Sequence, residues 1–251
     1  MIFYIVYFIF GLFTGSILYR YIECLPERRS LTAPLTCSPC GRKLKFVGMK
    51  PLIGNSGNNG SCQSCEDPFL RRKTVIELLT AFLFVLCYIS FGSTVKILNA
   101  LLLTCFLIVI SHIDYDYSLI PDKVLLPMAV VGVILNLFLG EIKILNMFVS
   151  AIIGGCVFLL LALISKGGFG GGDIKFMACL GLWLGIKNTF LAMLICFILG
   201  GIGAAVLILL KKKTLKDKFP YGPYIAMASF ITLLYGDSIV AWYWNWAFQV
   251  K

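Results

Sequence analysis

Long apolar runs separated by short polar segments dominate this sequence and limit what it can fold into. A helix needs about 20 apolar residues to cross a bilayer, or somewhat fewer when it is tilted or packed among neighbours. A content of 59% hydrophobic residues and a mean hydropathy of +0.92 leave little room for a soluble domain. The chain is therefore predicted to be an all-α polytopic membrane protein with about eight transmembrane helices. The predicted spans cover approximately 1–22, 74–93, 96–114, 123–140, 144–165, 174–186, 188–210 and 219–237.

The sixth span is the shortest of the eight. On apolarity alone, 174–210 would form one bent helix, but Lys187 and Asn188 interrupt it and predict a turn. The charge pattern supports this turn, because cytoplasmic loops collect Lys and Arg. Without the turn the chain would have seven spans, and the basic run 211–218 would lie outside. With eight spans and the N-terminus outside, four of the 22 basic residues lie on the outer side: Lys96, Lys143, Lys187 and Lys251.

Residues 23–73 form the one sizeable polar segment, which this topology places in the cytoplasm. The chain is thus divided into a first helix (1–22), a cytoplasmic loop domain (23–73) and a membrane-embedded domain (74–251). The net charge of +10 does not indicate nucleic-acid binding. The basic residues lie in short loops between apolar spans, where they set the topology and form no basic and aromatic surface.

Four cysteines in the polar segment have the spacing of a metal site. Cys37 and Cys40 form one CxxC pair, and Cys62 and Cys65 form a second pair after 21 intervening residues. Four thiolates complete a tetrahedral Zn²⁺ site and leave no open position, which indicates a structural metal. Disulfides are the main alternative, and the reducing cytoplasm disfavours them. The segment is predicted to be a small zinc-binding loop domain.

Four of the twelve acidic residues fall at the cytoplasmic ends of predicted spans: Asp114, Asp116, Asp122 and Asp173. Two carboxyl groups in one partly dehydrated site do not both ionise easily, so one retains a proton near neutral pH. The ionised member can then deprotonate a water for attack on an amide carbonyl, while the protonated member donates to the carbonyl oxygen.

Other roles for these acids remain open at this stage. Asp116 and Asp122 are also suited to capping helices or pairing with Lys123 and Lys175. A helix cap at Asp173 does not require the glycines that precede it. These glycines therefore favour another role, in which a peptide substrate lies extended against the flexible backbone. An ion-coupled transporter with a zinc-binding regulatory loop would also use intramembrane acids and broken helices.

Five motifs, taken in order, resemble those of the type IV prepilin peptidases, which are bifunctional leader peptidases and N-methyltransferases of the GxGD membrane aspartyl protease group. The first three are the paired CxxC motifs, the acid Glu77 at the start of the second span and a D-x-D-x-x-x-I-P-D stretch from Asp114 to Asp122. The other two are the GxGD box of Gly170, Gly171, Gly172 and Asp173, and the family's P-F-G-P sequence before the last span, matched by Pro220, Tyr221, Gly222 and Pro223. The order of the five motifs is more specific than any one of them.

The resemblance implies that Asp114 and Asp173 are the catalytic pair. It implies supporting positions at Asp116, Asp122, Glu77, Gly170, Gly171 and Gly172. The implied reaction is cleavage of short basic leaders from type IV prepilin or pseudopilin substrates, after a glycine, at the cytoplasmic face of the bacterial inner membrane. Methylation of the new N-terminus with S-adenosylmethionine would follow. A basic leader suits an anionic leaflet, while the hydrophobic segment after the cut stays among the membrane lipids.

The sequence departs from the family pattern at four positions, and methylation is expected to be weak or absent if the family's polar residues there serve the methyl donor or its acceptor. Tyr19 and Cys24 stand where the family usually has asparagine and arginine, and Asn59 and Ser61 replace the common arginine and lysine around a glycine. No glycine-rich fingerprint marks a methyl-donor site, so no donor-binding residues are assigned. A transporter would show inverted repeats, which are absent from this sequence, and a non-catalytic assembly factor would lack one acid of the pair.

Overall fold

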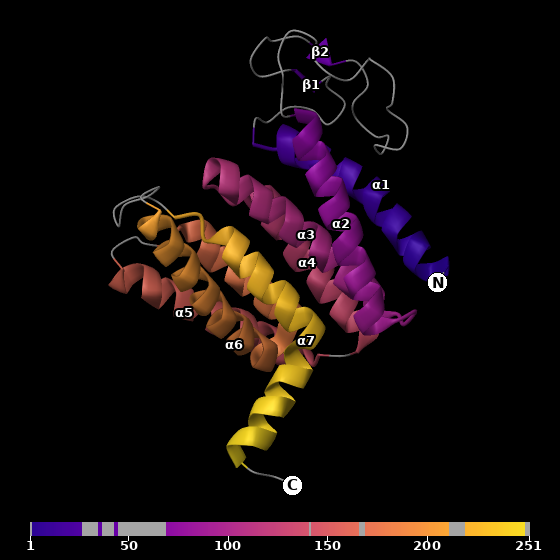
Figure 1. Cartoon of the computed structure of the whole chain (residues 1–251). Coiled ribbons are helices and arrows are strands. Elements are labelled where there is room, and N and C mark those ends of the chain that lie inside the picture. The colour runs from indigo at the N-terminus through magenta and orange to yellow at the C-terminus, as the bar shows by residue number, and fades with distance from the viewer. Residues whose placement is uncertain are drawn as a thin grey trace. The chain divides into compact units, whose positions relative to one another are not determined.

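The computed structural model describes residues 2–26, 35–36, 43–44, 69–140, 142–165, 169–210 and 219–248 (Figure 1). Within these residues, seven helices are long and apolar enough to cross a membrane. The prediction of a polytopic helical membrane protein is confirmed. The elements, in chain order, are α1 (Ile2–Cys24), β1 (Leu35–Thr36), β2 (Lys43–Leu44), α2 (Phe69–Phe91), α3 (Lys96–Tyr117), α4 (Asp122–Leu139), α5 (Ile144–Ile164), α6 (Gly171–Leu209) and α7 (Gly222–Phe248).

The count of long helices in the described residues is seven instead of the eight predicted. The predicted spans 174–186 and 188–210 both belong to α6, which has 39 residues. This helix is interrupted at Gly185, whose φ of 71° and ψ of 171° are not helical. Only glycine adopts such a conformation without steric cost. We call residues 171–184 the first arm of α6 and residues 186–209 its second arm.

Contacts with α5 show that the two arms run in opposite directions. The hydroxyl groups of Ser150 and Thr189, on the second arm, are 2.8 Å apart. On the first arm, a Cβ added at Gly181 would lie 2.6 Å from the Cα of Ala151. A straight helix would separate residues 181 and 189 by about 12 Å, yet they meet neighbouring residues of α5. The predicted reversal therefore exists, at Gly185 rather than at Lys187 and Asn188.

Two asparagines bind the backbone on either side of this reversal. Asn136 Nδ2, from α4, donates to the Leu182 carbonyl at 3.0 Å. The Ile186 N–H donates to Asn146 Oδ1, from α5, at 2.9 Å. Backbone groups released from a helix inside a membrane protein need such partners, because lipid offers none. Neighbouring helices thus make the break at Gly185 compatible with a membrane environment.

The N-terminal unit, Met1–Ile97, contains α1 and α2. These helices pack closely, since a Cβ at Gly11 would lie 2.5 Å from the Cα of Ala81 and one at Gly15 would lie 2.7 Å from the Cα of Glu77. Small residues allow this approach in membrane helices. The unit also contains a short antiparallel pair, β1 and β2, with Leu35 opposite Leu44. The all-α prediction did not include it.

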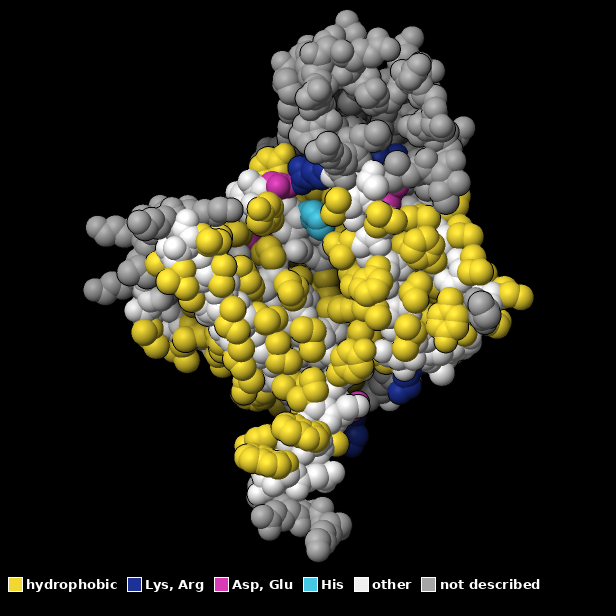
Figure 2. Space-filling model, viewed as in Figure 1, with side chains coloured by type: hydrophobic (Ala, Val, Ile, Leu, Met, Phe, Trp, Pro, Cys, Tyr) yellow, Lys and Arg dark blue, Asp and Glu magenta, His cyan; other side chains and the backbone are white. Residues whose placement is uncertain are grey.

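The second unit, Leu98–Lys251, contains α4 to α7 and nearly all of α3. Its core is apolar, with Met128, Phe158, Phe176 and Ile225 fully buried. Large apolar side chains also face outward, as Figure 2 shows over most of the visible described surface. Such a surface is unfavourable in water and suits contact with lipid tails.

Candidate active site

Asp114 lies near the C-terminal end of α3 and is 5% exposed. Its Oδ2 accepts a hydrogen bond of 2.8 Å from the backbone N–H of Gly222, the first residue of α7. A Cβ at position 222 would lie 2.7 Å from that same oxygen. Glycine is therefore required for this approach. The start of a helix, with its free N–H groups, is a favourable place for a carboxylate.

Asp173 occupies the third position of α6 and is 8% exposed. Its Oδ2 accepts a hydrogen bond of 2.9 Å from the N–H of Gly170, the residue that caps the helix. In return, the Asp173 N–H donates to the Gly170 carbonyl at 3.1 Å. This reciprocal arrangement resembles the capping box found at helix starts. It fixes the Asp173 carboxyl at the N-terminal end of α6 and restricts its rotation.

The structure brings Asp114 and Asp173 together, close enough for their charges to interact. Tyr221 also interacts with Asp173, and its neighbour Gly222 holds Asp114. Three segments therefore converge: the end of α3, the start of α6 and the start of α7. Across the described ranges, neither aspartate takes part in a salt bridge. Two buried carboxyls without a cation can act as an acid and base pair.

The glycines of the GxGD box lie in three different environments. Gly170 is the N-cap and is extended, with φ −74° and ψ 151°. Gly171 and Gly172 already belong to α6, so the helix begins inside the glycine run. A Cβ at Gly171 would meet nothing within 4 Å, whereas one at Gly172 would lie 2.9 Å from the Cβ of Ile120. Gly172 thus lets the segment before α4 pack against the start of α6.

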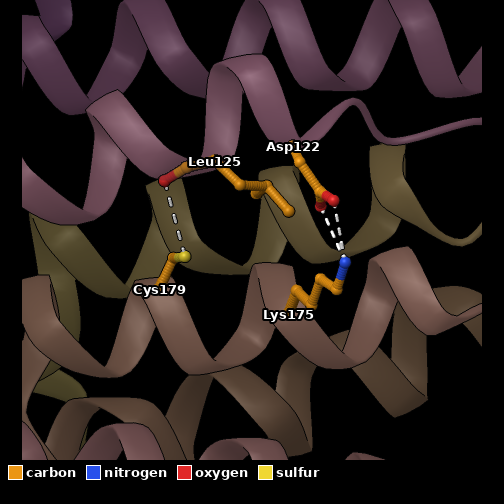
Figure 3. Close-up of polar contacts among 4 residues, drawn as sticks. All are labelled: Asp122, Leu125, Lys175 and Cys179. Carbon is orange, nitrogen blue, oxygen red and sulfur yellow. Dashed lines mark hydrogen bonds and ion pairs between the residues drawn. The ribbon is translucent and has the colours of Figure 1, made fainter.

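The other two predicted acids of this region do not join the buried pair. Asp116 is exposed. Asp122, at the start of α4, forms an ion pair with Lys175 in which both carboxylate oxygens lie 2.9 Å from Nζ (Figure 3). Nearby, Cys179 Sγ lies 3.7 Å from the Leu125 carbonyl in the same view. The predicted pairing of Asp122 with Lys175 is thus present, and it ties α4 to the first arm of α6.

Glu77 lies in the N-terminal unit and forms part of a separate buried cluster. It is fully buried in α2 and accepts a hydrogen bond from the Ser16 hydroxyl of α1. Lys73 Nζ, which is 2% exposed, lies 3.6 Å from Glu77 Oε1. The charge of Glu77 is therefore balanced inside its own unit. The four predicted zinc ligands, Cys37, Cys40, Cys62 and Cys65, lie outside the described residues.

Comparison with known proteins gives two family models that match different parts of the chain. The type IV leader peptidase family matches residues 101–205, and the bacterial peptidase A24 N-terminal domain matches residues 9–91. The prepilin leader peptidase/N-methyltransferase of Aeromonas salmonicida (strain A449) is 35% identical over 223 residues, which cover 86% of this chain and 77% of the relative. The chain belongs to the type IV leader peptidase family. It is therefore an enzyme, and the resemblance drawn from its motifs is confirmed.

Other relatives of this leader peptidase cover similar shares of the chain. The prepilin leader peptidase/N-methyltransferase of Bacillus subtilis (strain 168) is 31% identical over 244 residues, 94% of this chain and 96% of the relative. The protein of the same name from Pseudomonas aeruginosa is 33% identical over 232 residues, 88% of this chain and 80% of the relative. No solved structure matches the chain.

Sequence analysis did not assign any residue after 173 to the site of this leader peptidase. The matched family segment, 101–205, contains both aspartates but ends before Tyr221 and Gly222. A signal was present, because Pro220 to Pro223 place a glycine at a helix start, where its N–H is free to bind a carboxylate. What the motif did not show was which carboxylate it would bind.

Proposed function

We propose that this leader peptidase is a membrane aspartic endopeptidase in which Asp114 and Asp173 are the catalytic pair. The observation that carries the proposal is the convergence of two buried carboxyls, each bonded through Oδ2 to the N–H of a glycine at a helix start. A structural acid in a membrane protein is normally balanced by a cation or several donors. These two acids instead lie close enough for their charges to interact, and neither forms a salt bridge within the described residues.

In the proposed reaction, one carboxyl is ionised and the other protonated. The ionised carboxylate takes a proton from a water, whose oxygen bonds to the carbonyl carbon of the scissile peptide. The protonated carboxyl donates to the carbonyl oxygen. The tetrahedral intermediate then collapses: the carbon–nitrogen bond breaks and the amine leaves with a proton from the first carboxyl. The second carboxylate takes back a proton from a hydroxyl of the intermediate, whose carbon becomes that of the product carboxyl group. The glycine N–H groups keep both Oδ2 atoms in place, which leaves each Oδ1 to face the water and the substrate.

The proposed substrate is the precursor of a type IV pilin or pseudopilin, cut after a glycine that ends its short basic leader. The relatives are named prepilin leader peptidases, which supports this class. The basic loops of the chain support an orientation with the catalytic face in the cytoplasm of a bacterial cell. A basic leader would then lie at the anionic leaflet while the apolar segment that follows remains in the bilayer.

The test is cleavage of a purified pilin-like precursor by the full-length enzyme in detergent, followed by gel shift. Asp114→Asn and Asp173→Asn should each reduce the cleavage rate by roughly 10³-fold or more, because each removes a group that handles a proton. Asp237→Asn, which removes an exposed acid paired with Lys187 at 2.8 Å, is the matched control and should cleave normally. Full cleavage by either dyad variant would exclude the assignment. Failure of the wild type to cleave would count against the proposed substrate class.

Methyl transfer from S-adenosylmethionine to the new N-terminus is a second candidate function. The relatives' names include N-methyltransferase, which favours it. The departures at Tyr19 and Cys24 concern side chains that are buried within the N-terminal unit, each 1% exposed. With labelled S-adenosylmethionine, the wild type should label only the cleaved product, and Asp173→Asn should label nothing because no new amine forms. Cleavage without label would restrict this chain to proteolysis.

We further propose that Cys37, Cys40, Cys62 and Cys65 hold one structural Zn²⁺. The donor set, four thiolates in two CxxC pairs, fits this ion, and β1 and β2 pair on either side of the first CxxC in the sequence. Metal analysis should find about one zinc per chain, and the double variant Cys37→Ser with Cys40→Ser should contain none. A metal-free wild type that still cleaves its precursor would remove the zinc assignment.

A further inference from the structure

The two aspartates are held by backbone donors that occupy equivalent places in the sequence. Gly170, which donates to Asp173, follows Phe169, and Gly222, which donates to Asp114, follows Tyr221. The two aromatic side chains contact each other, with ring centroids 4.7 Å apart and planes at 69°. This edge-to-face geometry is a favoured arrangement of aromatic rings. The ring contact thus joins the two loops whose next residues position the carboxyls.

Each ring is also fixed to a different helix. Phe169 packs edge-to-face on Phe158, a fully buried residue of α5, at a centroid distance of 5.5 Å. The Tyr221 hydroxyl interacts with the thiol of Cys196 on the second arm of α6. It also lies against Gly200, where an added Cβ would be 2.5 Å from the hydroxyl oxygen. The two rings therefore connect α5 with the second arm of α6, next to the N-terminal ends of α6 and α7.

We propose that the Phe169–Tyr221 ring contact is a positioning device that sets the distance between Asp114 and Asp173. The inference rests on the proposed function, because it assumes that these two aspartates act together. Both residues are positioning residues, since they act through the N–H groups of Gly170 and Gly222. If one ring is removed, its loop can shift, and the carboxyl bound to the following glycine shifts with it.

The proposal predicts a specific change in kinetics. A displacement of about 1 Å at the reacting groups can lower a rate by roughly 10²-fold while leaving substrate binding intact. Phe169→Ala and Tyr221→Ala should therefore each lower kcat by about 10- to 100-fold with KM within about twofold of the wild type. The double variant should be no slower than the slower single variant, because either substitution alone breaks the same contact.

Two further variants separate this role from others. Tyr221→Phe keeps the ring and removes only the hydroxyl, so its kcat should remain within about threefold of the wild type. Phe106→Ala is the matched control, because Phe106 is a half-buried ring of the same unit that contacts Trp183 at 6.2 Å. It should leave kcat unchanged. Thermal unfolding of each purified variant in the same detergent should show a folded protein.

The experiment uses full-length enzyme and the same pilin-like precursor as the cleavage assay. A raised KM with unchanged kcat would overturn the inference and assign the rings to substrate binding. Multiplicative losses in the double variant would also overturn it, because they show independent roles. If Phe169→Ala and Tyr221→Ala fail to fold, Phe169→Leu is the substitute that removes a ring, and its full activity would contradict the ring contact. In each of these cases, the proposed function is still supported if the wild type cleaves the precursor and Asp114→Asn does not.

Discussion

Two groups of buried carboxyls, one in each unit, are held in different ways. In the N-terminal unit, Glu77 has the Lys73 ammonium at 3.6 Å and a hydrogen bond from Ser16. In the second unit, Asp114 and Asp173 each accept a backbone N–H, and no cation of the described segments pairs with them. Both arrangements remove acids from solvent. Only the second lacks a salt bridge within the described residues.

The difference lies in what the removal of each group does to its neighbours. A buried ion pair loses its balance when one partner is removed, and the remaining charge is left in a medium of low dielectric. A carboxyl held by a backbone N–H beside a second carboxyl leaves no stranded cation when it is neutralised. Substitutions in the first group should therefore affect folding, and substitutions in the second should affect catalysis.

The largest effect on stability is expected from Glu77→Gln. It removes the negative charge that lies 3.6 Å from the Lys73 ammonium, which is 2% exposed, and it should lower the free energy of unfolding by about 3–5 kcal/mol. Asp114→Asn and Asp173→Asn should remain as stable as the wild type. Unfolding in detergent with increasing denaturant measures all three variants under one condition.

The control for this comparison is Glu77→Gln combined with Lys73→Met. The double variant removes both charges and keeps an acceptor for Ser16, so most of the lost stability should return. If Glu77→Gln were as stable as the wild type but inactive, the distinction between a structural and a catalytic group of acids would be wrong.

The next effect is expected from Gly222→Ala, which tests the backbone donor instead of the acid. The added Cβ would lie 2.7 Å from Asp114 Oδ2, so the carboxyl must move away from the N–H that now holds it. We expect a fall in kcat of about 10²-fold, comparable to a misplacement of about 1 Å. Steady-state cleavage of the precursor measures it.

Gly171→Ala is the matched control, because a Cβ there would meet nothing within 4 Å. It should cleave at nearly the wild-type rate, and alanine is also the better helix former. Equal losses in both variants would show that glycine matters at these helix starts for flexibility and not for the approach of Asp114.

Much of this arrangement was predictable from sequence. Apolar length gave the helices, and the interruption near Lys187 correctly indicated a reversal, which the structure places at Gly185. The position of the turn was missed because it depends on Asn136 and Asn146, side chains of other helices that bind the freed backbone. Periodicity along one segment contains no information about such partners.

The candidate site shows the same limit. Topology grouped four acids, Asp114, Asp116, Asp122 and Asp173, at the same predicted membrane face, and the family resemblance singled out Asp114 and Asp173 as the pair. The donor Gly222 is 108 positions away from Asp114 in the chain, and only the folded backbone shows which carboxyl it binds. Likewise, the sequence predicted that the glycines before Asp173 favour an extended peptide substrate, whereas the close approach of Gly172 to Ile120 is seen only in the folded structure.

The smallest effect is expected at the third kind of acid, the exposed Asp122. Its side chain is 70% exposed and that of Lys175 is 59% exposed, so water screens the pair that ties α4 to α6. Asp122→Asn should lower the free energy of unfolding by less than about 1 kcal/mol and leave the cleavage rate within about threefold. Raising the salt concentration should reduce the difference from the wild type further, because screening weakens an exposed pair. A loss of cleavage comparable to that of Asp173→Asn would instead place Asp122 among the groups that handle protons, and the catalytic unit would contain three acids rather than two.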